Sequence, residues 1–260
     1  MPLRPTDVFV ASYQRSGTTW TQELVWLLSN DLDYKTAAAI PLTERYPFLD
    51  LFMFAEINHL DALFKPTDTT IDLPKIEAVF EIFGQPATRI LEAMPVSTPR
   101  FIKTHLPMSL LKPSLKELLK SFWNLFYKDL CIFCPIFEHV KEAWEKRNHP
   151  NMLFLFYEDL SKDLNASISR VADFLGKKIT QEESVRLYEH LSFDNFKNNK
   201  SVNFEDMREI GLLAPTESFV RKGKTGGWRD YFDEEMTQQA EQWIADNLRN
   251  TDLRYPHMNN

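Results

Sequence analysis

One stretch near the start of the chain, Asp7 to Leu28, restricts the fold more than any other. It reads DVFVASYQRSGTTWTQELVWLL. The apolar run Asp7–Tyr13 predicts a buried strand, and the spaced apolar residues of Thr18–Asn30 predict the helix that follows it. The short turn between them contains Gly17, one of only seven glycines among 260 residues. A buried strand joined to a helix by a tight turn is a building unit of parallel α/β sheets.

The rest of the chain continues this alternation, without an internal repeat or a linker that would mark a domain boundary. Arg100–Thr104 and Met152–Tyr157 predict two further short strands. Helices are predicted over Lys116–Arg147 with a break at Pro135, over Asp163–Leu175 with a stop at Gly176, from a capping box at Thr180–Glu183, and over Asp233–Leu248. We therefore expect a single α/β domain over residues 1–260 with a mainly parallel sheet. Three strands are few, because a sheet usually has about 4–6.

The charge and the cysteine content exclude several classes of protein. A net charge of −7 argues against a general binder of nucleic acids or anionic membranes, so an anionic ligand needs a local basic site. Met1–Asp7 lacks the pattern of a signal peptide. The most apolar stretch, Leu118–Phe137, has polar residues at helical spacing and predicts a buried amphipathic helix, not a membrane span. Two cysteines do not form a disulfide framework, and we expect a cytoplasmic protein.

The turn after the first strand has the composition of an oxyanion site. Ligands of parallel sheets bind beyond the carboxyl ends of the strands, and the N–H groups of a helix start favour anions. Gly17 permits a tight turn, Ser16, Thr18 and Thr19 supply hydroxyl groups, and Arg15 supplies a cationic guanidinium. The same residues also suit a simple helix cap. The turn is not a Walker A loop, because the motif and its lysine are absent.

A second glycine cluster, RKGKTGGW at Arg221–Trp228, combines three glycines with three basic residues. Successive N–H groups in a glycine-rich turn can form an anion-binding nest, although a basic run can also be a solvated loop. Two such sites in one acidic chain suit a ligand with two anionic ends.

Several segments together resemble the cytosolic sulfotransferase family. YQRSGTTW (Tyr13–Trp20) is similar to its 5′-phosphosulfate loop, FIKTHLP (Phe101–Pro107) to its catalytic segment, and RKGKTGGW to its 3′-phosphate motif. LFLFYEDL (Leu153–Leu160) and FEHVKEAWEKRNHPN (Phe137–Asn151) also match family text. The resemblance implies a three-layer αβα sandwich with a P-loop-like fold around a mainly parallel central sheet.

The resemblance also implies the reaction and its catalytic residues. A sulfuryl group passes from the co-substrate 3′-phosphoadenosine-5′-phosphosulfate to a hydroxyl or amine of a small apolar or phenolic acceptor. His105 is the general base, and Lys103 and Arg15 stabilise the developing negative charge. The family usually has lysine in place of Arg15, and arginine keeps the charge but donates a proton poorly. No metal is required, because fixed cations and donors neutralise this charge.

The same match assigns the nucleotide contacts. Arg15, Ser16, Gly17, Thr18 and Thr19 hold the 5′-phosphosulfate, Trp20 stacks on the adenine, Tyr157, Ser192 and Phe193 contact the nucleotide, and Arg221, Lys222 and Gly223 bind the 3′-phosphate. Phe48, Phe52, Phe54 and the aromatic residues of Phe122–Phe137 suggest an apolar acceptor. No nucleic-acid or membrane partner is expected. Asp233 and Glu234 alter the family's dimer segment, which leaves a homodimer open.

The chain departs from the family between Leu115 and Trp144. There the family inserts a strand that ends in an arginine and is followed by a serine, and both residues contact the 3′-phosphate. This chain shows no such strand, and it begins almost at the first strand, without the N-terminal extension of its relatives. We therefore predict a shortened member with one strand missing, weak nucleotide binding and poor or no turnover.

The sequence also contains features that suggest other interpretations. MLFLFYED (Met152–Asp159) resembles a Walker B strand and suggests a P-loop kinase or NTPase, but the Walker lysine is absent. A non-catalytic protein derived from the family could keep its nucleotide or small-ligand site without turnover. Cys131 and Cys134 form a C-x-x-C pair, but a zinc site needs four ligands, so we expect structural cysteines.

Overall fold

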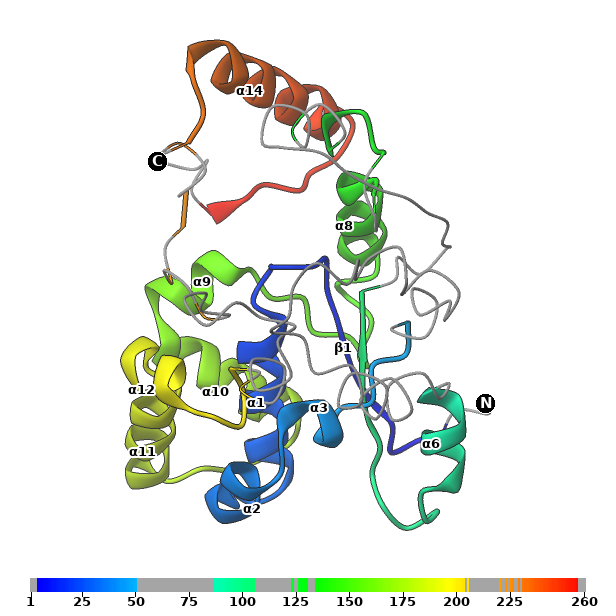
Figure 1. Cartoon of the computed structure of the whole chain (residues 1–260), viewed down its shortest axis with the longest axis vertical. Helices are drawn as coiled ribbons and strands as arrows, with labels where there is room; N and C mark the ends of the chain where they lie inside the picture. Colours follow the sequence, from blue (N-terminus) through cyan, green and yellow to red (C-terminus); the bar gives the residue numbers. More distant parts are fainter. Residues whose placement is uncertain are drawn as a thin grey trace, which may run out of the picture. The chain divides into compact units, whose positions relative to one another are not determined.

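The computed structural model describes residues 4–50, 87–105, 123, 126–130, 134–203, 205, 220, 223, 225–226, 229 and 231–256 (Figure 1). The chain divides into two compact units. Unit 1 comprises Met1–Ala11, Thr18–Thr104 and Thr180–Arg221, and unit 2 comprises Ser12–Gly17, His105–Ile179 and Lys222–Asn260. That both units belong to one domain stays a prediction.

The sheet of unit 1 is parallel, as the sequence predicts. Strand β1 (Val8–Ala11) pairs with β2 (Phe101–Thr104), with Val8 opposite Phe101 and Ala11 opposite Thr104. Phe48 forms a parallel bridge with Lys103, through hydrogen bonds from Lys103 N to Pro47 O (3.2 Å) and from Leu49 N to Lys103 O (2.9 Å). Strand β2 therefore has hydrogen-bonded neighbours on both sides.

The helices of unit 1 surround this strand pair. They are α1 (Thr18–Ser29), α2 (Tyr34–Ala39), α3 (Leu42–Arg45), α6 (Ala87–Ala93), α11 (Gln181–Leu191) and α12 (Phe193–Asn198). Helix α1 packs against β1, α2, α3 and α11 (Figure 1). Its residues Leu24, Leu27 and Leu28 are fully buried, as the apolar spacing predicts. The predicted capping box of Thr180 and Glu183 is confirmed at the start of α11.

The helices of unit 2 are α8 (Ile136–Glu145), α9 (Tyr157–Lys162), α10 (Leu164–Phe174) and α14 (Glu234–Leu248). Asp163 caps α10, and Gly176 has φ +65° just beyond its end, as predicted. Asp233, which departs from the family's dimer segment, caps α14 by accepting a hydrogen bond from Met236 N at 3.0 Å. An aromatic cluster around Trp243 forms the core beneath α14.

The third predicted strand is wrong. Residues 152–156 lie in no strand of the described part of the chain, and α9 begins at Tyr157. Aromatic residues of this segment pack on other aromatic rings. The ring centroids of Phe154 and Phe156 lie 5.2 and 5.8 Å from that of Trp144. The ring centroid of Phe156 also lies 5.8 Å from that of Tyr255. Of the predicted helix over 116–147, α8 follows Pro135 as expected, whereas residues 106–122 lie outside the described residues.

Candidate active site

The loop Ser12–Gly17 continues directly from β1. Its backbone is unusual, because Arg15 has φ +65° and Gly17 has φ +85°. A Cβ atom on Gly17 would lie 2.7 Å from Cδ2 of Tyr157, so the ring of Tyr157 occupies the space that a side chain would need. Gly17 is required for its backbone conformation and for this close approach. The left-handed, exposed Arg15 is a strained residue of the kind found at functional sites.

Tyr13 anchors the start of this loop within unit 2. Its side chain is buried, and its hydroxyl lies 3.4 Å from Sγ of Cys134. Its ring makes edge contacts with Phe126 at 6.2 Å and with His139 at 6.1 Å. Cys134 is a half-buried free thiol within this packing, while its predicted companion Cys131 lies outside the described residues.

His105 follows the last residue of β2 and is only 8% exposed. Its Nδ1 lies 2.8 Å from the backbone oxygen of Ser12 in the loop. A carbonyl oxygen only accepts hydrogen bonds, so Nδ1 carries the hydrogen. The lone pair of the neutral ring is then on Nε2. This tautomer is the one that a general base acting through Nε2 requires.

Lys103 lies within β2, in unit 1. Its Nζ is 4.2 Å from the centroid of the Phe48 ring, a cation–π contact. Burial lowers the pKa of Lys103 from 10.5 to about 8, while the negative charge of Asp50 acts in the opposite direction. Asp50 is fully buried. The ammonium group is therefore partly stripped of water and loses its proton far more readily than an exposed lysine.

Trp20, Ser192 and Phe193, which were predicted to contact the nucleotide, are brought together in unit 1. The indole N–H of Trp20 donates to Leu191 O at 2.9 Å, at the residue directly before Ser192. Ser192 and Phe193 form the junction between α11 and α12. The ring of Trp20 also lies 6.5 Å from that of Phe196 in α12.

The remaining predicted site residues are described only in part. Thr18 and Thr19 are the first residues of α1, Thr18 being buried, and Ser16 is exposed in the loop. Gly223 has φ +61° and Gly226 has φ +68°, as a glycine turn requires. Arg221, Lys222, Phe52 and Phe54 lie outside the described residues.

Sequence reasoning missed the buried charges that support these residues. Glu23 is fully buried in α1, and it contacts Arg45 of α3 and His190 of α11. A signal was present, since Glu23 is the one charged residue of α1, and a lone carboxylate in an apolar helix is rarely buried without a partner. The role of Asp50 beside Lys103 had no such local signal.

The sequence model of the sulfotransferase domain matches residues 5–120 and 116–252 of the chain. Because the two stretches cover nearly all of it, the chain belongs to the sulfotransferase family, and its activity is enzymatic sulfotransfer. Its fold is the sulfotransferase fold, an α/β arrangement with a parallel sheet.

The chain is similar to several known proteins, and the identity and coverage of three of them show how far the similarity extends. The luciferin sulfotransferase of Photinus pyralis is 31% identical over 283 aligned positions, which cover 95% of this chain and 72% of that protein. Human sulfotransferase 1E1 is 25% identical, and the alignment covers 97% of this chain and 87% of that protein. A structure of retinol dehydratase with androsterone and the inactive cofactor PAP is 49% identical with a TM-score of 0.92, over 99% of this chain and 85% of that chain.

These matches also bear on the predicted shortening. The alignment with the luciferin sulfotransferase spans 283 positions, more than the 260 residues of this chain, so that relative has residues without a counterpart here. The domain model matches as two stretches that both include residues 116–120, within the predicted gap between Leu115 and Trp144. The first observation agrees with a shorter chain, and the second agrees with a segment missing at this position.

Within the described residues, none of the helices is long and apolar enough to cross a membrane. No group of three or more His, Cys, Asp or Glu side chains suited to a metal ion occurs within the described ranges.

Proposed function

We propose that this protein transfers the sulfuryl group of 3′-phosphoadenosine-5′-phosphosulfate to the hydroxyl group of a small apolar alcohol or phenol. The acceptor oxygen forms a bond to sulfur while the bond from sulfur to the bridging phosphate oxygen breaks. The acceptor proton passes to Nε2 of His105, and the leaving group is adenosine 3′,5′-bisphosphate. The solved neighbours that contain PAP support this choice of co-substrate.

The observation that carries this proposal is the hydrogen bond from Nδ1 of His105 to Ser12 O. It fixes the neutral tautomer whose Nε2 can accept a proton, and it ties the ring to the loop that precedes Gly17. A positioned base of this kind contributes roughly 10²–10⁴-fold to a rate.

Lys103 and Arg15 are proposed to stabilise the charge that develops on the sulfuryl and phosphate oxygens. Lys103 suits this role because it is poorly solvated, and charge interactions strengthen where water is excluded. Arg15 is exposed in a loop whose Gly17 is closely approached by the ring of Tyr157. The roles of Lys103 and Arg15 are proposed on the grounds of family membership and of chain order after the two parallel strands.

The rest of the proposed nucleotide site follows the sequence match. Ser16, Gly17, Thr18 and Thr19 hold the 5′-phosphosulfate, and Trp20, Tyr157, Ser192 and Phe193 contact the nucleoside, with Arg221, Lys222 and Gly223 on the 3′-phosphate. Two further predictions rest on the sequence, namely a cytoplasmic location and independence of metal ions. The sequence leaves a homodimer open.

The acceptor is proposed to be an apolar alcohol. Retinol dehydratase, which is 49% identical to this chain, has been crystallised with retinol and with androsterone, two apolar molecules that each carry a hydroxyl group. Phe48, beside Lys103, is an aromatic side chain next to a proposed catalytic cation. Both points favour an apolar acceptor over a polar one.

The missing segment is proposed to weaken this activity. Two lost phosphate contacts at about 1.5–3 kcal/mol each reduce nucleotide affinity by about a hundredfold or more. We therefore expect a high KM for the nucleotide and slow turnover.

The direct test is incubation of the full chain with sulfur-labelled co-substrate and a set of acceptors that includes retinol, androsterone and simple phenols. We expect a labelled product that disappears in His105→Asn. Calorimetry with adenosine 3′,5′-bisphosphate, on the natural chain and on Arg221→Ala, measures the nucleotide site separately. Binding without any product in the natural chain would favour a non-catalytic binding protein, and normal kcat and KM would refute the predicted impairment.

A further inference from the structure

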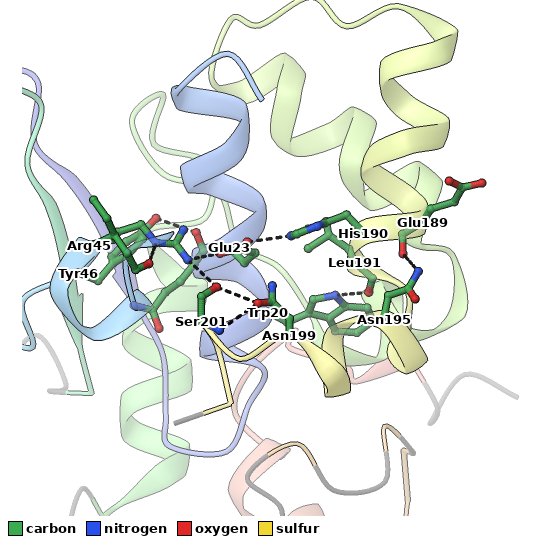
Figure 2. Close-up of polar contacts among 12 residues, drawn as sticks. Trp20, Glu23, Arg45, Tyr46, Glu189, His190, Leu191, Asn195, Asn199 and Ser201 are labelled. Atoms are coloured by element: carbon green, nitrogen blue, oxygen red, sulfur yellow. Dashed lines mark hydrogen bonds and ion pairs between the residues drawn. The ribbon is translucent and has the colours of Figure 1, made fainter. Parts of the chain in front are cut away.

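The indole of Trp20 is held from one side by the end of helix α11. Its N–H donates to Leu191 O at 2.9 Å (Figure 2). Leu191 is the last residue of α11 and Ser192 begins the turn into α12. The orientation of the Trp20 ring therefore depends on where the end of α11 lies relative to α1.

A hydrogen bond to a buried carboxylate, one helical turn further along α1, joins the same two helices. Glu23 lies three residues after Trp20, so both side chains lie on one side of α1. Its Oε1 accepts a hydrogen bond from Nε2 of His190 at 2.9 Å, and His190 directly precedes Leu191 (Figure 2). Glu23 is fully buried, so this bond is well shielded from water.

The other oxygen of Glu23 connects the contact to a third helix. Oε2 lies 2.7 Å from Nη2 of Arg45 in α3, and Nε of Arg45 donates to Ile40 O at 2.9 Å. Nη2 of Arg45 also lies 3.5 Å from Oγ of Ser201 (Figure 2). Arg45 is thus fixed at several atoms, and it holds the carboxylate of Glu23 in one place.

The end of α11 is tied down at a second point. The backbone oxygen of Glu189 accepts hydrogen bonds from Oγ of Ser192 and from Nδ2 of Asn195, each at 2.7 Å. His190 and Leu191 therefore lie within a turn whose neighbours are held on both sides.

A buried ion pair is weak support for stability, because removing two charges from water costs about as much as their attraction returns. Its geometry, however, is directional, because each oxygen of Glu23 faces a different partner. The network formed by Glu23, Arg45, His190 and Ser201 thus suits a role in setting the register between helices.

We infer that the hydrogen bond between Glu23 and His190 is a positioning contact for the adenine of the co-substrate. It sets the end of α11 so that Leu191 O orients the Trp20 ring and Ser192 and Phe193 take their places beside it. This inference rests on the proposed function, in which Trp20 stacks on adenine.

Two substitutions of His190 provide a matched test. In His190→Gln the amide nitrogen can replace Nε2 and still donate to Glu23, whereas in His190→Asn the shorter amide corresponds to Nδ1 and cannot reach it. Calorimetry measures the affinity for adenosine 3′,5′-bisphosphate and for the same ribose bisphosphate without a base. The ratio of the two affinities reports the contribution of the adenine.

We expect His190→Asn to lower this ratio by about tenfold, a part of what base stacking on an aromatic ring contributes. His190→Gln should restore most of it, and the affinity for the base-free probe should not change. Trp20→Phe, which keeps a ring but removes the N–H group, should lower the ratio as well. Its effect should combine with that of His190→Asn less than additively, because both act on one contact.

Asp7→Asn is the control, because it alters a different buried ion pair of unit 1, that between Asp7 and Arg100. If the affinity ratio drops as much in Asp7→Asn as in His190→Asn, the effect of His190→Asn is explained by general destabilisation and the inference is contradicted. If folded His190→Asn has the same affinity ratio as the natural chain while Trp20→Ala binds the nucleotide more weakly, the inference is overturned but the proposed nucleotide site is not. Failure of Trp20→Ala to change binding, or no binding by the natural chain, would overturn the proposed nucleotide site and the inference with it. If His190→Asn does not fold, Trp20→Phe with an unchanged ratio would contradict the inference.

Discussion

The two ends of the parallel strand pair β1–β2 are built in opposite ways. At the amino ends, Arg100 Nε and Nη2 donate to the two carboxylate oxygens of Asp7 at 2.7 and 2.5 Å, and Nη1 donates to Leu91 O at 3.1 Å. Both side chains are at most 2% exposed. These polar groups satisfy one another within the fold.

At the carboxyl ends, the charged residues have unfavourable surroundings or an unfavourable backbone conformation. Lys103 is desolvated against an aromatic ring, and the loop that continues β1 contains Arg15 with φ +65°. His105, which follows β2, donates from Nδ1 to Ser12 O, so that Nε2 carries the lone pair whenever the ring is neutral. The amino ends maintain the structure, and we propose that the carboxyl ends carry the chemistry, as is usual for parallel sheets.

The largest effect on activity is expected for His105→Asn. It removes the proposed base while a side-chain amide keeps a donor for Ser12 O, so the loop should stay in place. Sulfotransfer should fall by about a thousandfold, with adenosine 3′,5′-bisphosphate binding nearly unchanged. Single-turnover rates and calorimetry separate the two quantities. A loss confined to nucleotide binding would assign His105 to the structure of the loop.

The next effect concerns the pH dependence of Lys103. Because its pKa is about 8, the free enzyme loses this positive charge above that pH. The kcat/KM for the nucleotide should therefore fall by about tenfold for each pH unit above about 8, since this parameter reports the free enzyme. The decrease in kcat should begin at a higher pH than the decrease in kcat/KM. The bound polyanion favours protonated lysine and so raises the pKa of Lys103 in the complex.

Lys103→Arg provides the control for this profile. Arginine stays charged throughout the range, so the alkaline decrease should disappear even if the absolute rate is lower. A natural profile that remains flat to about pH 10 would separate Lys103 from the reaction.

A smaller effect is expected at the glycine of the loop. Gly17→Ala places a Cβ 2.7 Å from Tyr157 Cδ2 at a residue with φ +85°, so the loop or the tyrosine ring must move. Nucleotide affinity should fall by about tenfold, and the free energy of unfolding by roughly 1–3 kcal/mol. Calorimetry and denaturant unfolding measure these changes.

Gly176→Ala is the matched control for backbone strain. Gly176 has φ +65°, but its Cβ would meet no atom within 4 Å. It should lose stability without losing nucleotide affinity. If both variants bind the nucleotide equally well, the close approach of Tyr157 has no role in the site.

Local signals in the sequence predicted the helices and their ends well. Thr180 with Glu183, Asp163 and Gly176 act on backbone groups only a few residues away, so their effects can be read from the sequence. The loop glycine was predicted for the same reason. The strand over Met152–Tyr157 was predicted from an apolar run, but a strand also needs a hydrogen-bonded neighbour, and within the described residues this segment is in no sheet.

The supporting contacts of the candidate site join distant parts of the chain. Ser12 and His105 are 93 residues apart, and Glu23 and His190 are 167 residues apart. Their residue types can be noticed in the sequence, but no spacing rule connects them. The resemblance to a family predicted the roles of His105 and Lys103 without predicting what holds either of them.

The smallest effect on sulfotransfer is expected for Asp7→Asn at the amino ends. The hydrogen bond from Arg100 holds the pKa of the Asp7 carboxyl below its ordinary value of 3.8. The pair therefore stabilises the fold above that value and loses its contribution as the pH falls through the lowered pKa. Asp7→Asn should lower the thermal midpoint by several degrees at pH 7, and the difference from the natural chain should shrink at strongly acidic pH. In folded protein at pH 7, kcat and KM should stay natural. A change in kcat larger than that of Gly17→Ala would show that the amino ends are not purely structural, and the contrast between the two ends of the strands would then be lost.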